Sequence, residues 1–310
     1  MPELPTGTLP PTTGAEPEPP AGVSARSRSH LGRLLISAGE HKLAAAGLVT
    51  AIGLTLFSFI GPLMYHANET ATNLVLANLP PSAAHPLGTT PEGRDELGQL
   101  MVGGQSTLVV GFAVAILGTA FGMIWGALAG YVGGFIDAAL MRIVDALLAI
   151  PFLFFIVLLA SITEPNLIII ILAITAASWQ STARLVRGEV LSLRTRSYVE
   201  VSQHLGAPHR YVIVRHLVPN VVGTVVVTAT LSMADAILSY AAVAFLGLSV
   251  PPPATSWGDL LTTGINNLFD GYWWQLWPPA IAIVLIVLAV NLLGDGIHDM
   301  TEHRHEVRSG

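Results

Sequence analysis

The chain has 310 residues, of which 11% are charged and 52% are hydrophobic. A typical soluble domain carries about 25% charged residues, so this composition argues against a soluble enzyme or a nucleic-acid-binding protein. The chain has no cysteine and a net charge of −6, which rules out disulfides and thiolate metal sites and offers no basic surface for nucleic acid.

Residues 1–36 are predicted to form a disordered, proline-rich cytoplasmic tail. Seven of the 21 prolines lie in the first 20 positions. A segment of this composition cannot bury enough apolar surface to offset the entropy lost on ordering. It also lacks the basic start and the apolar core of a signal peptide.

Apolar segments long enough to cross a bilayer follow, since a spanning helix needs about 20 mostly apolar residues. Six are expected, at about Leu43–Met64, Ser106–Tyr131, Ala138–Ile162, Leu167–Leu185, Val221–Leu248 and Trp277–Gly296. The chain is therefore predicted to be an all-α integral membrane protein with six transmembrane helices. Residues 37–103 would hold the first helix and an extracytoplasmic loop. Residues 104–300 would form a five-helix core and residues 301–310 a second cytoplasmic tail.

The basic residues predict the orientation of these helices. With six spans, 13 of the 14 Lys and Arg residues fall on one side of the membrane, and Arg94 alone falls on the other. Cytoplasmic loops carry the excess of Lys and Arg in membrane proteins. Both termini are therefore expected in the cytoplasm, with outer loops at about 65–105 and 249–276.

Glycines recur at every fourth position of the second predicted span. They are Gly118, Gly122, Gly126, Gly130 and Gly134. Small residues at this spacing make one helix face flat, so that another backbone can approach closely. The stripe favours tight packing inside the helix bundle. The alternative is a pore-facing or subunit-facing surface that slides during transport.

The predicted cytoplasmic loop 188–220 is the most informative segment. It reads as two short helices with a break at 206–208, because glycine permits the left-handed conformation that ends a helix and proline suits the start of the next. Helical spacing groups its apolar residues into two stripes, Tyr198, Val201 and Leu205, and Tyr211, Val214 and Leu217. Such a loop favours docking on a partner protein, and the alternative is a loop lying on lipid headgroups.

This loop resembles the "EAA" loop of ABC-importer permeases. Glu200 is followed by Gly206 and, thirteen residues later, by Pro219, although Val201 and Ser202 replace the two usual alanines. In that family the loop forms coupling helices that sit in clefts of the cytoplasmic ATPases. The resemblance implies that the docking residues are Tyr198, Glu200, Leu205, Gly206, Ala207, Tyr211 and Pro219.

Other segments resemble the second permease subunit (C-type) of dipeptide and oligopeptide importers. The first is His85–Thr89 with Gly93-Arg94-Asp95, and the second is Gly130–Gly134 with Asp137, Met141-Arg142, Asp145 and Pro151. The third is Phe245–Ser249 with Pro251–Pro253 and Trp257-Gly-Asp259, and the last is Asn291–Gly296. The resemblance implies a type I importer permease fold in a bacterial plasma membrane. The implied partners are a homologous permease, two ABC ATPase subunits and an extracytoplasmic solute-binding protein. Peptide is the implied substrate, and nickel chelates, glutathione or another small solute are the alternative.

Four residues in the predicted spans have individual expectations. Asp235 is the only acid well inside a span, and a carboxylate there is costly, so it should face a cavity, a polar partner or the sister subunit. A role in the translocation pathway and a satisfied contact in the bundle are both open. Arg142 and Asp145, three residues apart, could pair with one another. Pro151 should kink the third span.

Missing motifs narrow the chemistry. The only lysine, Lys42, follows a histidine, so the chain has no Walker A loop to hold nucleotide phosphates. No cofactor or metal is therefore expected in this chain, and ATP hydrolysis should belong to partner subunits. An intramembrane enzyme or receptor is the remaining alternative. It is disfavoured because no histidine or lysine accompanies Asp235 at membrane depth.

Overall fold

A computed structural model describes residues 30–65, 71–162 and 166–309. The chain divides into two compact units, residues 1–38 and 39–310. In the first unit the described residues form the start of α1 (His30–Met64), so this helix begins within the segment expected as a tail. Residues 1–29 of that expected tail lie outside the described residues.

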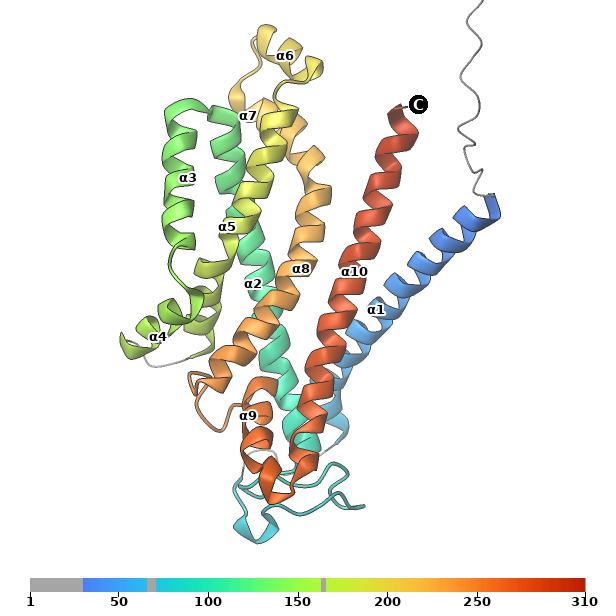
Figure 1. The fold of residues 1–310 in the computed structure, drawn as a ribbon, viewed down its shortest axis with the longest axis vertical. Coiled ribbons are helices and arrows are strands. Elements are labelled where there is room, and N and C mark those ends of the chain that lie inside the picture. The colour runs from blue at the N-terminus through green and yellow to red at the C-terminus, as the bar shows by residue number, and fades with distance from the viewer. Residues whose placement is uncertain (1–29, 66–70, 163–165, 310) are drawn as a thin grey trace, which may run out of the picture. The chain divides into compact units, whose positions relative to one another are not determined.

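The second unit is built from helices, and the described residues include no β-strand, which confirms the all-α prediction. After α1 come α2 (Glu96–Val132), α3 (Gly134–Leu148), α4 (Phe152–Ile162), α5 (Leu167–Leu193), α6 (Ser197–His204), α7 (His209–Val212), α8 (Val218–Phe245), α9 (Trp257–Asn267) and α10 (Trp277–Ser309). Short helical turns are η1 (Leu74–Leu76), η2 (Ile213–Leu217), η3 (Leu268–Asp270) and η4 (Trp273–Gln275). Helices α6 and α7 lie at one end of the bundle and α9 lies at the other (Figure 1).

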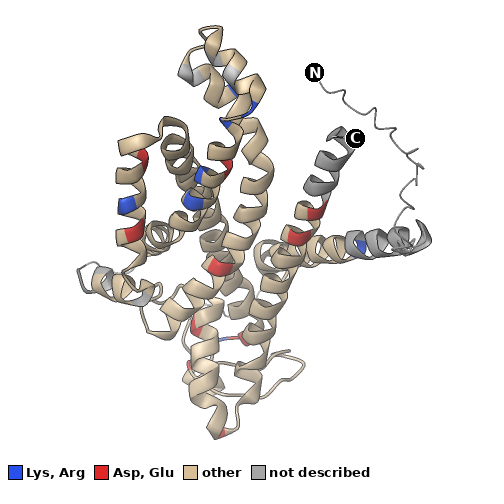
Figure 2. Cartoon of the chain, turned by 45° about the horizontal axis from the view of Figure 1, so that its top comes forward, with Lys and Arg blue, Asp and Glu red and all other residues tan. Residues whose placement is uncertain are grey.

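Five described helical stretches are long and apolar enough to cross a membrane. They are Lys42–Met64, Glu96–Val132, Leu167–Leu193, Ile213–Phe245 and Trp273–Asp299, and they match the first, second, fourth, fifth and sixth predicted spans. Helix α10 continues to Ser309, through the segment expected as a second tail. Figure 2 shows that the Lys and Arg residues gather mainly toward the end that carries α6 and α7.

The third predicted span is not one continuous helix. It consists of α3, with 15 residues, and α4, with 11 residues, and each falls short of the roughly 20 residues that span a bilayer. The break falls at Pro151, which has no N–H to donate and clashes with the preceding helical turn. The Pro151 carbonyl instead accepts from the Phe155 N–H as α4 begins. The proline therefore separates two helices, where the sequence predicted only a kink.

A buried apolar core holds α2, α8, α9 and α10 together. Leu108, Ile237, Trp257 and Ile286 each have 0% of their surface exposed. The Trp257 indole N–H donates to the Leu100 carbonyl at 2.8 Å, and its backbone N–H donates to the Thr107 hydroxyl at 3.1 Å. Because a buried indole N–H needs a partner, these bonds fix the start of α9 against α2.

Candidate functional site

The segment 197–217, which contains α6, α7 and η2, forms the end of the bundle opposite α9 (Figure 1). Both short helices predicted here are present. Helix α6 ends at His204, and Gly206 follows with a φ of +80°, which glycine adopts without the penalty that a side chain would bring. The Ala207 N–H closes the turn by donating to the Ser202 carbonyl at 3.1 Å. Helix α7 then starts directly after Pro208.

Buried valines and a leucine anchor this segment to the helices below it. Val199, Val212 and Leu217 are each 0% exposed, and they pack in one cluster with side chains of α2, α5 and α8. Ala207 is partly buried against the same cluster. Helical spacing groups Leu217 with Tyr211 in a second stripe, whereas the structure buries Leu217 in this core, where η2 continues directly into α8.

The other side of the segment is an exposed apolar face. Its side chains and their exposed fractions are Tyr198 (45%), Val201 (56%), Leu205 (83%), Tyr211 (49%) and Val214 (67%). Pro219 is also exposed, whereas the side chain of Glu200 lies outside the described residues. Several exposed apolar side chains on one short segment are typical of an interaction site. We call these five side chains the docking face.

His216 joins the two halves of the docking face. Its ring lies 5.8 Å from the ring of Tyr198 and 5.6 Å from the ring of Tyr211, measured between centroids. Aromatic pairs at these separations attract one another. This cluster could not be predicted from helical spacing, because the turn at Gly206 separates Tyr198 from His216 in the sequence.

The glycine stripe of α2 lies against α5. A Cβ on Gly122 would stand 2.6 Å from the Trp179 carbonyl oxygen, and one on Gly126 would stand 2.2 Å from the Ala183 carbonyl oxygen. Gly118 and Gly130 likewise face Ser178 and Val190 of α5. Two helices approach this closely only where side chains are absent. Gly134 departs from the stripe because it begins α3.

Two ion pairs connect α3 to α5. The Arg187 guanidinium donates to both carboxylate oxygens of Asp137, one of them at 2.7 Å, and this bond holds the pKa of Asp137 below its usual range. Asp145 pairs with Arg184 of α5 at 2.5 Å. The pairing of Asp145 with Arg142 expected from the sequence is therefore wrong, because the packing of α3 on α5 brings Arg184 across.

Asp235 lies exposed on α8 and makes no hydrogen bond or ion pair with the described residues. It precedes the end of the helix at Phe245 by ten residues, which corresponds to about 15 Å along the helix axis. Hydroxyl side chains occupy the same helix face at a spacing of three or four residues, Thr224, Thr228, Ser232 and Ser239. A polar stripe therefore runs along α8 through Asp235.

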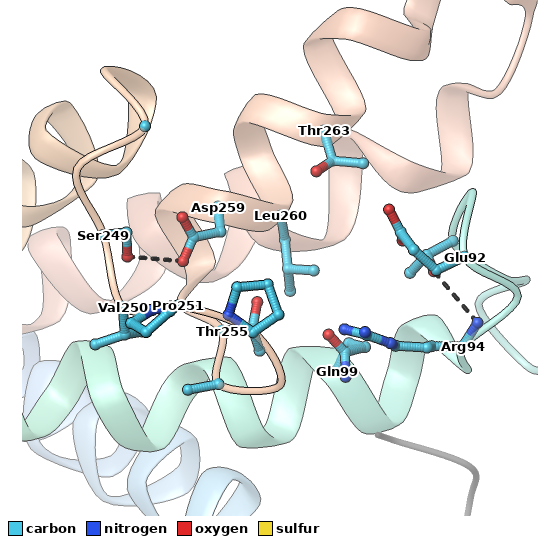
Figure 3. A pocket seen from close by; sticks show the side chains of 14 residues that line it. Glu92, Arg94, Gln99, Ser249, Val250, Pro251, Thr255, Asp259, Leu260 and Thr263 are labelled. Carbon is cyan, nitrogen blue, oxygen red and sulfur yellow. Dashed lines mark hydrogen bonds between the residues drawn. The ribbon is translucent and has the colours of Figure 1, made fainter. Parts of the chain in front are cut away.

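A polar pocket of about 450 Å³ lies at the α9 end (Figure 3). One wall comes from the loop before α2 and from its first turn, and the other from the α8–α9 loop and α9 itself. The polar residues that line it are Thr90, Glu92, Arg94, Gln99, Ser249, Thr255, Asp259 and Thr263. We call it the outer pocket. Segments about 150 residues apart in the sequence thus meet in one site.

Asp259 is held in place by serine hydroxyls. Ser249 donates to Asp259 Oδ2 at 2.8 Å and Ser256 donates to the same oxygen at 2.7 Å. Ser256 also accepts from the Asp259 N–H and so caps α9. Burial raises the pKa of Asp259, against the opposing effect of these hydrogen bonds.

Arg94 is left without a partner on the opposite wall. Its Nε is buried and has no hydrogen-bond partner, and the guanidinium makes no ion pair with the described residues. Glu92 makes no ion pair with Arg94, although only Gly93 separates the two residues. Gly93 has a φ of +72°, and a Cβ there would collide with the Asn73 carbonyl, so the chain turns sharply between the two charges.

Comparison with known protein families identifies the family of this chain. Residues 122–307 match the family "Binding-protein-dependent transport system inner membrane component". The chain belongs to this family. The match includes most of the glycine stripe, all of the docking face and Asp235, whereas the Arg94 wall of the outer pocket precedes it.

Curated relatives in this transport family are peptide permeases by name. The chain is 38% identical over 260 residues to the dipeptide transport system permease protein DppC of Bacillus subtilis (strain 168), which covers 84% of this chain and 81% of the relative. It is 37% identical over 277 residues to the oligopeptide transport system permease protein OppC of the same strain, covering 89% and 90%. The OppC protein of Haemophilus influenzae is 36% identical, covering 84% of each chain.

A solved structure supports the permease fold of this family member. The fold matches a chain of the MetNI methionine ABC transporter, in an inward-facing conformation, with a TM-score of 0.54. The match covers 65% of this chain and 95% of the other, at 23% sequence identity. The predicted ABC importer permease fold is thereby confirmed. Among the described residues, five continuous helices are long and apolar enough to span a membrane, and the third predicted span is divided into α3 and α4.

Proposed function

We propose that this chain is the permease subunit of an ATP-driven importer of dipeptides and oligopeptides. The observation that carries the proposal is the docking face, an exposed apolar surface held by a fully buried anchor, on a chain that belongs to an inner membrane transport family. The names of the relatives supply the substrate class, since they are dipeptide and oligopeptide permeases at 36–38% identity.

The docking face would transmit movement from ATPase subunits to the membrane helices. Its anchor residues Val199, Val212 and Leu217 pack against α2, α5 and α8. A push on the docking face would therefore reach three membrane helices through a close-packed core, which transmits strain because it has few voids. In this mechanism ATP binding closes two ATPase subunits, the helices rearrange to alternate access, and hydrolysis resets them. Both ATPases would be subunits separate from this chain.

The translocation pathway would form between this chain and a homologous permease. Asp235 supports this, because an exposed carboxylate about 15 Å inside a membrane helix is costly in contact with lipid and is stable where water or a second protein covers it. The polar stripe of α8 would then line part of the pathway. An extracytoplasmic solute-binding protein would deliver peptide at the α9 end, and both termini would lie in the cytoplasm of a bacterium with this subunit in its plasma membrane.

The docking step is tested by co-purification. The permease is expressed with its sister permease and ATPases, and the ATPase bound per permease is measured. Leu205→Asp is expected to abolish ATPase binding, because it places a charge on the most exposed residue of the docking face. Gly206→Asp should do the same by straining the turn. Glu200→Arg reverses the charge of the acidic residue in the family motif, and it should also abolish ATPase binding.

Phe269→Asp is the matched control, since Phe269 is 95% exposed but lies in η3 at the opposite end. It should retain the ATPases. Equal retention by Leu205→Asp and Phe269→Asp would refute docking through this face.

The substrate is tested separately. Uptake of labelled peptides and of nickel is measured in a strain that lacks the protein, with and without the protein supplied from a plasmid. If the supplied protein restored uptake of nickel but not of peptide, the proposed substrate would be contradicted.

A further inference from the structure

Arg94 lines the outer pocket, and its buried Nε has no hydrogen-bond partner. Figure 3 shows its side chain reaching from one wall into the pocket, with Asp259 on the other wall. A buried nitrogen without a hydrogen-bond partner is unfavourable, and more so when it belongs to a charged group. A ligand that accepts hydrogen bonds from Nε and a neighbouring Nη would remove this deficit. A carboxylate does so with two parallel bonds.

The pocket also offers negative charge, kept apart from Arg94. Asp259 is fixed by Ser249 and Ser256, while the carboxylate of Glu92 makes no hydrogen bond or ion pair with the described residues. Neither acid lies within ion-pair distance of Arg94, because the only described ion pairs are those of Asp95, Asp145 and Asp137. The pocket therefore combines one free cation with two acids. A ligand with a carboxylate at one end and an ammonium group at the other complements both.

The size of the pocket suits a short peptide. Its volume of about 450 Å³ falls in the range of small-molecule sites, about 300–1,000 Å³. An extended chain advances at most about 3.6 Å per residue, so a dipeptide places its termini about 7 Å apart. The uncharged lining, Gln99, Thr255 and Thr263 among it, can hydrogen-bond the peptide backbone.

We propose that the outer pocket is an entry site for zwitterionic peptide, in which Arg94 binds the terminal carboxylate and Asp259, with Glu92 at the rim, receives the terminal ammonium group. The inference rests on the proposed import of peptides and adds a binding site to it. The position agrees with this role, since Arg94 is the one basic residue that the charge distribution assigns to the outer side. Peptide released at that side would meet this site before it meets the polar stripe of α8.

The test uses the complete complex, with sister permease, ATPases and binding protein, reconstituted in proteoliposomes. Uptake is measured for one labelled peptide in three forms, with both termini free, with the carboxylate amidated, and with the amine acetylated. The free-to-amide ratio reports on the carboxylate, and the free-to-acetyl ratio reports on the amine. The binding protein is identical for every permease variant, so comparing the ratios between variants cancels its own preference.

Arg94→Gln should lower the free-to-amide ratio about tenfold to a hundredfold and leave the free-to-acetyl ratio unchanged, as expected for loss of hydrogen bonds to a charged group. Arg94→Lys should recover part of the loss, because it keeps the charge without the fork. Asp259→Asn should lower only the free-to-acetyl ratio. Asp270→Asn, an exposed acid at the same end outside the pocket, should leave both ratios as in the wild type.

Two results would overturn the proposal. Unchanged ratios in Arg94→Gln and Asp259→Asn would show that the pocket does not bind the termini. An equal decrease for all three peptide forms, at normal assembly of the complex, would show a structural role only. Failure of the wild-type complex to accumulate any peptide with ATP would instead refute the proposed function itself, so the two failures are distinguishable.

Discussion

At the scale of single residues, Gly126 has the least room of the glycines in the α2 stripe. A Cβ there would stand 2.2 Å from the Ala183 carbonyl oxygen and 3.0 Å from the Arg187 nitrogen, and neither backbone atom can rotate away. Gly126→Ala should therefore separate α2 from α5 and destabilise the protein by about 1–3 kcal/mol, as overpacking does. The measurement is the thermal unfolding midpoint of the purified permease in detergent.

Gly53→Ala is the control for this substitution, because Gly53 also lies in a helix but nothing is within 4 Å of its added Cβ. Its unfolding midpoint should stay level or rise slightly, since alanine favours helix by about 1 kcal/mol over glycine. If Gly126→Ala were as stable as Gly53→Ala, the close approach of α2 and α5 would be wrong.

The titration of Asp259 makes a prediction about pH. Burial raises its pKa in the native state, whereas aspartate in an unfolded chain titrates near 3.9. Just above that pH the native state therefore binds more protons, and the free energy of unfolding falls as the pH rises through this window. The asparagine of Asp259→Asn does not titrate, so the free energy of unfolding of this variant lacks this decrease. The stability of the wild type relative to the variant should decrease as the pH rises above about 4, measured by thermal unfolding, and a constant difference would contradict the raised pKa.

At the scale of elements, the two ion pairs between α3 and α5 should differ in strength. The Arg184 and Asp145 side chains are each 51% exposed, while those of Arg187 and Asp137 are 34% and 13% exposed. Exposed pairs contribute about 0–1 kcal/mol, and hydrogen bonds to charged groups with less solvent contribute about 1.5–3 kcal/mol. Double-mutant cycles, with each Asp replaced by Asn and each Arg by Gln, should give the larger coupling energy for Arg187–Asp137. The reverse order would show that burial does not decide their strength.

The elements also show what the sequence can predict. The break between α6 and α7 was predictable because Gly206 and Pro208 act through their own backbones, and the glycine spacing correctly indicated a flat face on α2. The partner of that face, α5, was not predictable, because periodicity shows which face is apolar and not which helix covers it. The Arg142–Asp145 pair failed for the same reason, since local spacing ignores a residue on a neighbouring helix.

At the scale of the whole molecule, hydropathy located the five described helical stretches that are long and apolar enough to span a membrane, but it did not predict that the third segment is divided. The third span was expected to bend at Pro151 and is instead divided into α3 and α4. The outer pocket could not be predicted from the sequence at all. Arg94 and Asp259 come together because Trp257 fixes α9 on α2 through hydrogen bonds that link residues about 150 positions apart, and no sequence pattern encodes that contact.

The orientation of the molecule in the membrane is the last prediction. The excess of Lys and Arg predicts that the α6–α7 end lies in the cytoplasm. Because the sequence contains no cysteine, a single introduced thiol can report on this orientation. Asp270→Cys and Leu205→Cys replace exposed side chains at opposite ends of the bundle. A membrane-impermeant maleimide added to intact spheroplasts should label the thiol of Asp270→Cys only. Leu205→Cys should react after the membrane is permeabilised. Labelling in the reverse order would place the docking face outside the cell, where no ATPase could reach it.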